Sequence, residues 1–188
     1  MDKLTQNQRW GKTCFECPNI AIDLLSDVVI FVALTEIMRS LIQRVSTCEV
    51  WIDGRLHSSI GRGLLILFGT RTGDGEESCA FLADKAINLR IFEDAQGKMN
   101  LSLLDVAGDI MIVSQFTLYA DARKGRRPSF TDAMEPVEAE RLYNCFVQQV
   151  GASGLMTRTG QFGARMEVRL ANNGPVTIML EHDVPEHS

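Results

Sequence analysis

The chain has 188 residues, of which 45% are hydrophobic and 23% are charged, and its formal net charge is -5. This composition predicts one globular domain whose core needs no disulfides or metal, and the acidic balance excludes a polycation that coats nucleic acid with its whole surface. Five irregularly spaced cysteines argue against a disulfide framework and favour reduced thiols in the cytoplasm.

The N-terminal segment has an apolar run over residues 20–37 that Asp23, Asp27 and Glu36 interrupt. Charges near the middle of a bilayer are costly, so the run is a poor membrane span, and it lacks the flanks of a signal peptide. Asp23 and Asp27 lie one helical turn apart, which favours a short amphipathic helix.

The pattern becomes regular after this segment. Apolar and β-branched residues predict an extended segment over residues 40–52, and Asp53-Gly54 is a hairpin signal that returns the chain over residues 55–60. Helical periodicity predicts helices over residues 76–89 and 136–150. Short apolar runs predict the remaining strands, over residues 64–69, 91–92, 110–115, 155–159, 166–171 and 176–180.

The order of these elements indicates the fold class. Strands outnumber helices, and hairpins outnumber strand–helix–strand crossovers. The sequence therefore predicts an α+β fold, in which a curved, barrel-like sheet of largely antiparallel or mixed strands carries two main helices on one side.

Polar residues end the predicted buried strand over residues 110–115. Ser114, Gln115 and Thr117 follow its apolar residues, and the end of a rigid strand positions polar side chains well for a site. A serine or threonine nucleophile needs a base, but the three histidines of the chain lie elsewhere and form no Ser-His-Asp order with these residues. The alternative interpretation is a strand that ends in ordinary turn residues.

A basic cluster interrupts the acidic chain. Four positive charges fall within five residues, at Arg123, Lys124, Arg126 and Arg127. Phosphate is the obvious anionic partner, and such contacts supply affinity without sequence reading. The alternative interpretation is a solvated loop.

Gly174-Pro175 lies between the two last predicted strands. Proline cannot donate to a sheet ladder and glycine weakens a strand, so the pair predicts a stiff bend whose carbonyl groups can point at a ligand. An ordinary loop turn is the alternative.

No cofactor or metal is predicted. Cys14 and Cys17 have the spacing of half a zinc site, but Cys48, Cys79 and Cys145 are scattered singly and fit small buried thiols better than further ligands. The glycine-rich segment over residues 69–75 lacks the lysine-serine ending of a P-loop.

Together these segments resemble the D-aminoacyl-tRNA deacylases, first known as D-tyrosyl-tRNA deacylases. The matching stretches follow the family order from residue 38 almost to the end, over residues 38–45, 88–94, 97–100, 114–118, 124–130 and 173–177. The resemblance implies a deacylase domain over residues 38–188. Residues 1–37 are then an extension, either a genuine appendage or an upstream translation with Met38 as the natural start, of which we favour the second.

The resemblance also implies an activity and a site. Family members are homodimers that hydrolyse the ester between a D-amino acid and tRNA and also remove glycine, as from mischarged tRNA-Ala. It implies that Ser114, Gln115, Phe116 and Thr117 line the catalytic pocket, with backbone amides near Gln115 and Phe116 stabilising the oxyanion. Because Thr117 lacks a base, we favour water activated with help from the terminal 2′-hydroxyl of the tRNA.

The resemblance assigns the handedness filter to Gly174-Pro175. It implies a cis bond and insertion of this motif into the partner subunit's site, where its carbonyl oxygens capture the substrate amino group and leave no room for an L side chain. Arg44 holds the motif across the dimer, and the basic cluster binds tRNA. The alternative functions are a non-catalytic tRNA-binding or editing-related module and, from Cys14 and Cys17 alone, a metal or redox protein.

Overall fold

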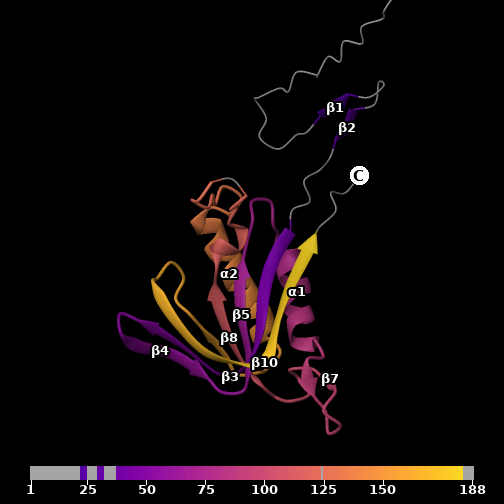
Figure 1. Cartoon of the computed structure of the whole chain (residues 1–188), viewed down its shortest axis with the longest axis vertical. Helices are drawn as coiled ribbons and strands as arrows, with labels where there is room; N and C mark the ends of the chain where they lie inside the picture. Colours follow the sequence, from indigo (N-terminus) through magenta and orange to yellow (C-terminus); the bar gives the residue numbers. More distant parts are fainter. Residues whose placement is uncertain (1–21, 25–28, 32–36, 124, 184–188) are drawn as a thin grey trace, which may run out of the picture. The chain divides into compact units, whose positions relative to one another are not determined.

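Figure 1 shows a computed structural model of the chain, which describes residues 22–24, 29–31, 37–123 and 125–183. The chain divides into two compact units, residues 1–35 with 185–188 and residues 36–184. In the first unit, β1 (Ile22–Leu24) pairs antiparallel with β2 (Val29–Phe31). The expected amphipathic helix is therefore wrong at Asp23, which lies in a strand, and Asp27 lies outside the described residues.

The second unit is organised around the long strand β3 (Ile37–Ile52). Strand β10 (Met166–Asp183) pairs antiparallel with β3 along both of its halves. On its other edge, β3 pairs antiparallel with β5 (Gly63–Gly69) through its first half and with β4 (Arg55–Ile60) through its second half. A single strand thus holds two neighbours in succession, which bends the sheet (Figure 1).

Parallel pairs complete the sheet. β5 pairs in parallel with β8 (Asp109–Ser114), and β8 pairs in parallel with β9 (Thr157–Thr159). The Oγ of Ser58 on β4 donates a hydrogen bond of 2.8 Å to the carbonyl oxygen of Thr159 on β9. The sheet therefore curls round until β4 meets β9 at the far edge. The sheet is therefore mixed and barrel-like, and the predicted fold class is confirmed.

Two hydrophobic cores lie on opposite faces of β5 and β8. Alternate residues of a strand point to opposite faces. Leu64 and Ile66 therefore belong to the larger core, and Leu65 between them belongs to the smaller one. The larger core packs against α1 (Glu76–Asn88) and α2 (Pro136–Gly151), which supply Leu82, Ala86, Leu142 and Phe146 among others. The smaller core fills the inside of the curl, between Val45, Val50, Ile60, Met111 and Val113.

Short elements complete the fold. β6 (Phe92–Glu93) pairs antiparallel with β7 (Met99–Leu101), and the 3-10 helix η1 (Phe116–Tyr119) follows β8 directly. Neither β7 nor η1 was predicted from the sequence. The two strands predicted around Gly174-Pro175 are one strand, β10, because both halves pair with β3. Within the described residues, no helix has the length and apolar character needed to cross a membrane.

Candidate functional site

A cleft of about 620 Å³ opens at the carboxyl ends of β5 and β8, beside the N-terminus of α2. Strands β5 and β8 run in parallel, so their last residues meet at one edge of the sheet. The lining residues are Phe68, Gly69, Thr70, Val113, Ser114, Gln115, Phe116, Phe130, Ala133, Met134, Glu135, Pro136, Ala139, Tyr143, Phe162, Gly163, Ala164, Met166 and Val168. Most of these side chains are apolar, so the cleft suits a largely apolar group.

Three of the four predicted catalytic residues line this cleft together. They are Ser114, Gln115 and Phe116. Thr117 follows in η1 and is exposed, and its hydroxyl accepts a hydrogen bond from the side-chain amide of Gln115. The partner of Thr117 is thus an amide, which cannot act as a general base.

The backbone amides predicted for the oxyanion differ in availability. The N–H of Gln115 donates to the carbonyl oxygen of Phe68 at 2.7 Å, so it is already committed to the sheet. Phe116 is the first residue of η1, and the first N–H groups of a helix have no partner within that helix. Of the two predicted donors, Phe116 is therefore the one suited to the oxyanion.

Long-range contacts hold η1 in position. The hydroxyl of Tyr119 lies 2.8 Å from the carbonyl oxygen of Ile37 and 3.2 Å from that of Gly69, and burial raises the Tyr119 pKa. Arg39 donates from Nη1 to the carbonyl oxygen of Leu118 at 2.9 Å, with its guanidinium 5.1 Å from the centre of the Tyr119 ring. Sequence reasoning missed Arg39 and Tyr119, since their partners are backbone groups far away in the sequence.

Gly69 is the sequence feature that could have revealed this contact. A Cβ atom at Gly69 would lie 2.8 Å from the carbonyl oxygen of Gln115 and 3.1 Å from Cε2 of Tyr119. The last residue of β5 must therefore lack a side chain for η1 to approach it.

Gly174-Pro175 leaves the sheet as a short loop within β10. The ladder to β3 is interrupted between Asn172, which pairs with Val45, and Thr177, which pairs with Gln43. The Gly174-Pro175 bond is cis, as expected, and Gly174 has φ of +123°. The side chain of Asn172 spans the base of the loop, accepting from the Val176 N–H at 2.9 Å and donating to the Thr177 hydroxyl at 2.8 Å.

Arg44 holds this loop from within the same chain. Its Nε donates to the carbonyl oxygen of Asn173 at 3.0 Å, its Nη1 donates to that of Ile91, and its Nη2 lies 3.8 Å from Oε1 of Glu93. The side chain is buried on β3. The resemblance implied a contact across the dimer, whereas this contact is within one subunit.

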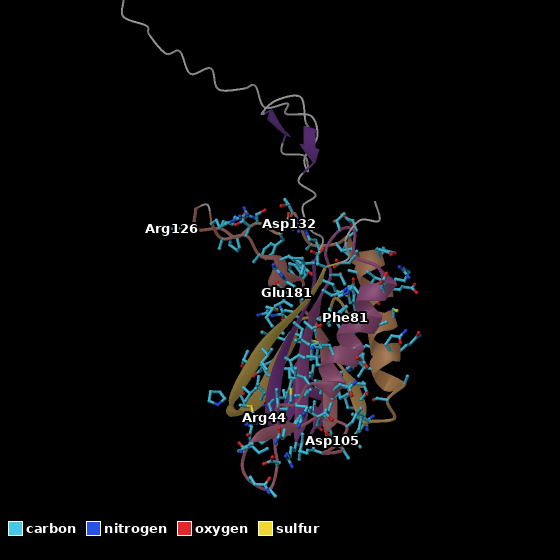
Figure 2. The ribbon with its side chains drawn as sticks, turned by 90° about the vertical axis from the view of Figure 1, so that its right-hand side faces the viewer. Arg44, Phe81, Asp105, Arg126, Asp132 and Glu181 are labelled. Carbon is cyan, nitrogen blue, oxygen red and sulfur yellow. The ribbon has the colours of Figure 1, made fainter. Side chains whose placement is uncertain are left out.

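One chain does not bring Gly174-Pro175 to its own Ser114. Arg44 pairs with Leu64 on β5, and Ser114 pairs with Phe68 four residues further along the same strand. Four residues of a strand span about 13 Å. Figure 2 shows Arg44 at one end of the sheet and the loop that carries Arg126 at the other. The predicted catalytic residues and the predicted handedness filter are therefore two separate clusters in a single chain.

The predicted basic cluster lies on an exposed loop. A bridge between Asp121 and Ser129 closes the base of this loop. Arg123 is held by Asp121 through two contacts of 2.8 Å, whereas Arg126 and Arg127 are exposed and have no ion-pair partner among the described residues. Lys124 lies outside the described residues. Among the described residues of the loop, the free positive charge is therefore at Arg126 and Arg127.

The cysteines suggest no site in the described part of the chain. No group of three or more His, Cys, Asp or Glu side chains there could hold a metal ion, and Cys14 and Cys17 lie outside the described residues. Burial raises the pKa of Cys48 to about 11 and that of Cys79 to about 12. Thiols with such values remain protonated and unreactive at neutral pH.

Comparisons with known proteins identify the family of the chain. The family model of D-Tyr-tRNA(Tyr) deacylase matches residues 41–181. The D-aminoacyl-tRNA deacylase of Thermomicrobium roseum is 56% identical over 144 residues, which cover 77% of this chain and 94% of that protein. The deacylase of Roseiflexus castenholzii is 54% identical, covering 77% and 92%.

Solved structures show the same fold. A structure titled c-Myc DNA Unwinding Element Binding Protein has a TM-score of 0.72 and 39% identity, covering 76% of this chain and 97% of that one. A probable eukaryotic D-amino acid tRNA deacylase has a TM-score of 0.67 at 19% identity, covering 78% and 100%. The chain therefore belongs to the D-Tyr-tRNA(Tyr) deacylase family, and it is an enzyme of the hydrolase class.

Proposed function

We propose that the protein hydrolyses the ester between a D-amino acid and the 3′-terminal adenosine of tRNA, as a homodimer that acts in cytoplasmic translation quality control. The observation that carries the proposal is the division of the site. The cleft with Ser114, Gln115 and Phe116 lies at one end of β5. The exposed cis Gly174-Pro175 loop is held by Arg44, whose partner Leu64 lies about 13 Å back along that strand. Two subunits with twofold symmetry can complete each other's sites.

The cleft receives the terminal adenosine and its ester. Apolar walls contributed by Ala139, Phe162 and Met166 suit a nucleobase, and Ser114 and Gln115 supply polar contacts to the sugar and the ester. Water, oriented by the neighbouring 2′-hydroxyl of the substrate, attacks the ester carbonyl. The Phe116 N–H stabilises the oxyanion, the bond from the carbonyl carbon to the ribose oxygen breaks, and that oxygen takes up the proton.

Gly174-Pro175 of the partner subunit selects the handedness of the substrate. Its carbonyl oxygens accept hydrogen bonds from the substrate ammonium group and occupy the space that an L side chain would need. A D side chain points away from this wall. Glycine has no side chain to exclude, so glycyl-tRNA, including glycine mischarged on tRNA-Ala, is also a substrate.

The basic loop contributes affinity for the rest of the tRNA. Arg126 and Arg127 are exposed and have no carboxylate partner among the described residues, so they are available to phosphates. Such contacts add binding energy without reading sequence, which suits an enzyme that accepts many tRNAs.

Hydrolysis of matched D- and L-aminoacyl-tRNA by the purified protein tests the activity. We expect the D-ester and the glycyl ester to be cleaved and the L-ester to survive. Binding of tRNA without hydrolysis of any ester would favour the non-catalytic tRNA-binding module instead.

Complementation between two inactive variants tests the shared site. Ala139→Trp fills the cleft and Gly174→Glu blocks the loop, so each homodimer should be inactive. A mixed dimer has one intact cleft facing one intact loop, and random exchange should restore about a quarter of the normal activity. Mixed dimers that form but remain inactive would exclude a site shared between subunits.

A further inference from the structure

An aromatic pair forms the outer end of the cleft. The rings of Phe116 and Phe130 lie with their centres 5.1 Å apart and their planes at 66°, and both residues line the cleft. Phe116 is 58% exposed and Phe130 is 37% exposed, whereas Phe68 and Tyr143 in the same lining are 2% and 4% exposed. The cleft therefore has a closed inner end and an open aromatic rim.

This rim stands at the foot of the basic loop. Asp121 and Ser129 close the loop with backbone hydrogen bonds of 2.8 and 2.9 Å, one residue before Phe130. Figure 2 shows Arg126 on the part of the loop that projects from the unit, and the segment over residues 123–130 contains no Asp or Glu. The exposed rings of Phe116 and Phe130 thus lie at the rim of the cleft, and the positive charge of the basic loop lies beyond them.

We propose that Phe116 and Phe130 form a stacking platform for the nucleobase that precedes the 3′-terminal adenosine, and that Arg126 and Arg127 contact the phosphates beyond it. Proteins bind single-stranded RNA by this combination of aromatic faces and a positive path along the backbone. The inference rests on the proposed function, because it assumes that the terminal adenosine fills the cleft. A docking protein would need no cluster of cations beside the apolar rim, so charge favours RNA.

The test compares a substrate that has the preceding nucleotide with one that lacks it. D-aminoacyl-tRNA reaches the platform, whereas D-aminoacyl-adenosine ends within the cleft. Phe130→Leu keeps an apolar side chain but removes the aromatic face. We expect it to lower kcat/KM for the tRNA about tenfold more than kcat/KM for the adenosine ester, and we expect Phe130→Tyr to restore the ratio.

Phe81→Leu is the matched control. Phe81 is 46% exposed on α1 and stacks on His182, outside the cleft lining, so its replacement should leave the ratio unchanged. An acceptor-stem RNA with 2-aminopurine before the terminal adenosine gives a direct signal, since its fluorescence changes when it leaves the neighbouring bases and stacks on Phe130. We expect this fluorescence change with the unaltered protein and with the Phe81 variant, and a smaller change with Phe130→Leu.

The outcomes separate this inference from the proposed function. If the unaltered protein cleaves neither substrate, the proposed function fails. If it cleaves both, and Phe130→Leu lowers both equally or leaves the fluorescence change intact, the platform alone is wrong. Dissociation of the dimer by Phe130→Leu in sedimentation experiments, with the substrate ratio unchanged, would identify the pair as a contact between proteins and overturn the inference.

Discussion

Arg44 donates a hydrogen bond from Nε to the backbone carbonyl oxygen of Asn173, at 3.0 Å. The same guanidinium donates to the carbonyl oxygen of Ile91, and the residue is only 5% exposed. One buried cation on β3 therefore connects the segment before β6 to the residue before Gly174. This contact fixes the loop at its entry, while the side chain of Asn172 spans its base.

Arg44→Lys should loosen this loop. A lysine has one ammonium group and lacks the planar fork that reaches both carbonyl oxygens, so a buried acceptor loses its partner at a cost of about 1–3 kcal/mol. We expect urea denaturation to show this loss, and we expect hydrolysis of L-aminoacyl-tRNA to rise. Arg55→Lys, at an exposed position on β4, is the control. Full stability together with intact discrimination would contradict the assigned role.

Gly174→Ala should impair hydrolysis of D-aminoacyl-tRNA. The added Cβ would lie 2.7 Å from Nη2 of Arg44 and 2.9 Å from Cγ2 of Val176, and φ of +123° disfavours any L side chain. Gly97→Ala is a matched control, because Gly97 also has positive φ but no heavy atom within 4 Å of its added Cβ. Equal rates for both variants and the unaltered protein would count against the loop as a part of the site.

Thr117→Ala should keep at least about a tenth of kcat. The Thr117 hydroxyl accepts from the amide of Gln115, and no histidine among the described residues lines the cleft, so the residue lacks the base that a nucleophile needs. Single-turnover hydrolysis of D-aminoacyl-tRNA measures the effect, with Thr131→Ala in the neighbouring loop as control. A fall to the uncatalysed rate, with the dimer and tRNA affinity preserved, would show that the hydroxyl itself reacts.

Replacement of both Arg126 and Arg127 by glutamine should weaken tRNA binding in a salt-dependent way. Loss of two phosphate contacts should lower the slope of log affinity against log salt by about 1.5. Arg123→Gln should have a smaller effect, since Arg123 is already paired with Asp121. Affinities for tRNA measured at several salt concentrations give the slopes. Equal slopes for the unaltered protein, the double variant and Arg123→Gln would exclude the loop from the RNA contact.

Cys79 should make the fold sensitive to alkaline pH. Burial, and then the neighbouring Cys145, raise the pKa of Cys79 from 9.0 to about 12. The folded state therefore keeps a proton that the unfolded state releases, so the contribution is complete below about pH 9 and disappears as the pH rises toward 12. Urea denaturation across this range should show a falling free energy of unfolding, with a shallower decline for Cys79→Ala. Identical declines would remove Cys79 as the cause.

Local patterns predicted the strands but not which strands pair. The apolar runs over residues 64–69 and 110–115 are buried strands, as expected, because both of their faces pack into a core. Their parallel pairing depends on the whole chain, and no local pattern contains it. Gly174-Pro175 predicted an interruption, which is correct, but only the shared partner β3 makes both halves one strand.

The site shows the same limit. Polar residues after a buried strand predicted Ser114, Gln115 and Thr117 as site residues, and the resemblance added Phe116. Ser114, Gln115 and Phe116 line one cleft, whereas Thr117 is not in its lining. η1 was missed because its position depends on Phe68, Gly69 and Ile37, whose carbonyl oxygens bond to Gln115 and Tyr119 from other strands. The roles of Arg44 and of the Gly174-Pro175 loop were inferred from family resemblance. Local sequence patterns do not show that β3 pairs with β10, and this pairing brings Arg44 to Asn173.

The interruption in β10 also constrains how the length of its loop can change. Pairing with β3 resumes at Thr177, and beyond it Ile178 and Leu180 face the larger core. A one-residue shift in the pairing with β3 beyond the loop would invert the inward and outward alternation of the residues that follow, exposing Leu180 and burying Glu181, so any change in loop length must preserve this register. The number of residues in the loop is therefore constrained by folding itself, apart from the substrate selection that we propose for Gly174-Pro175.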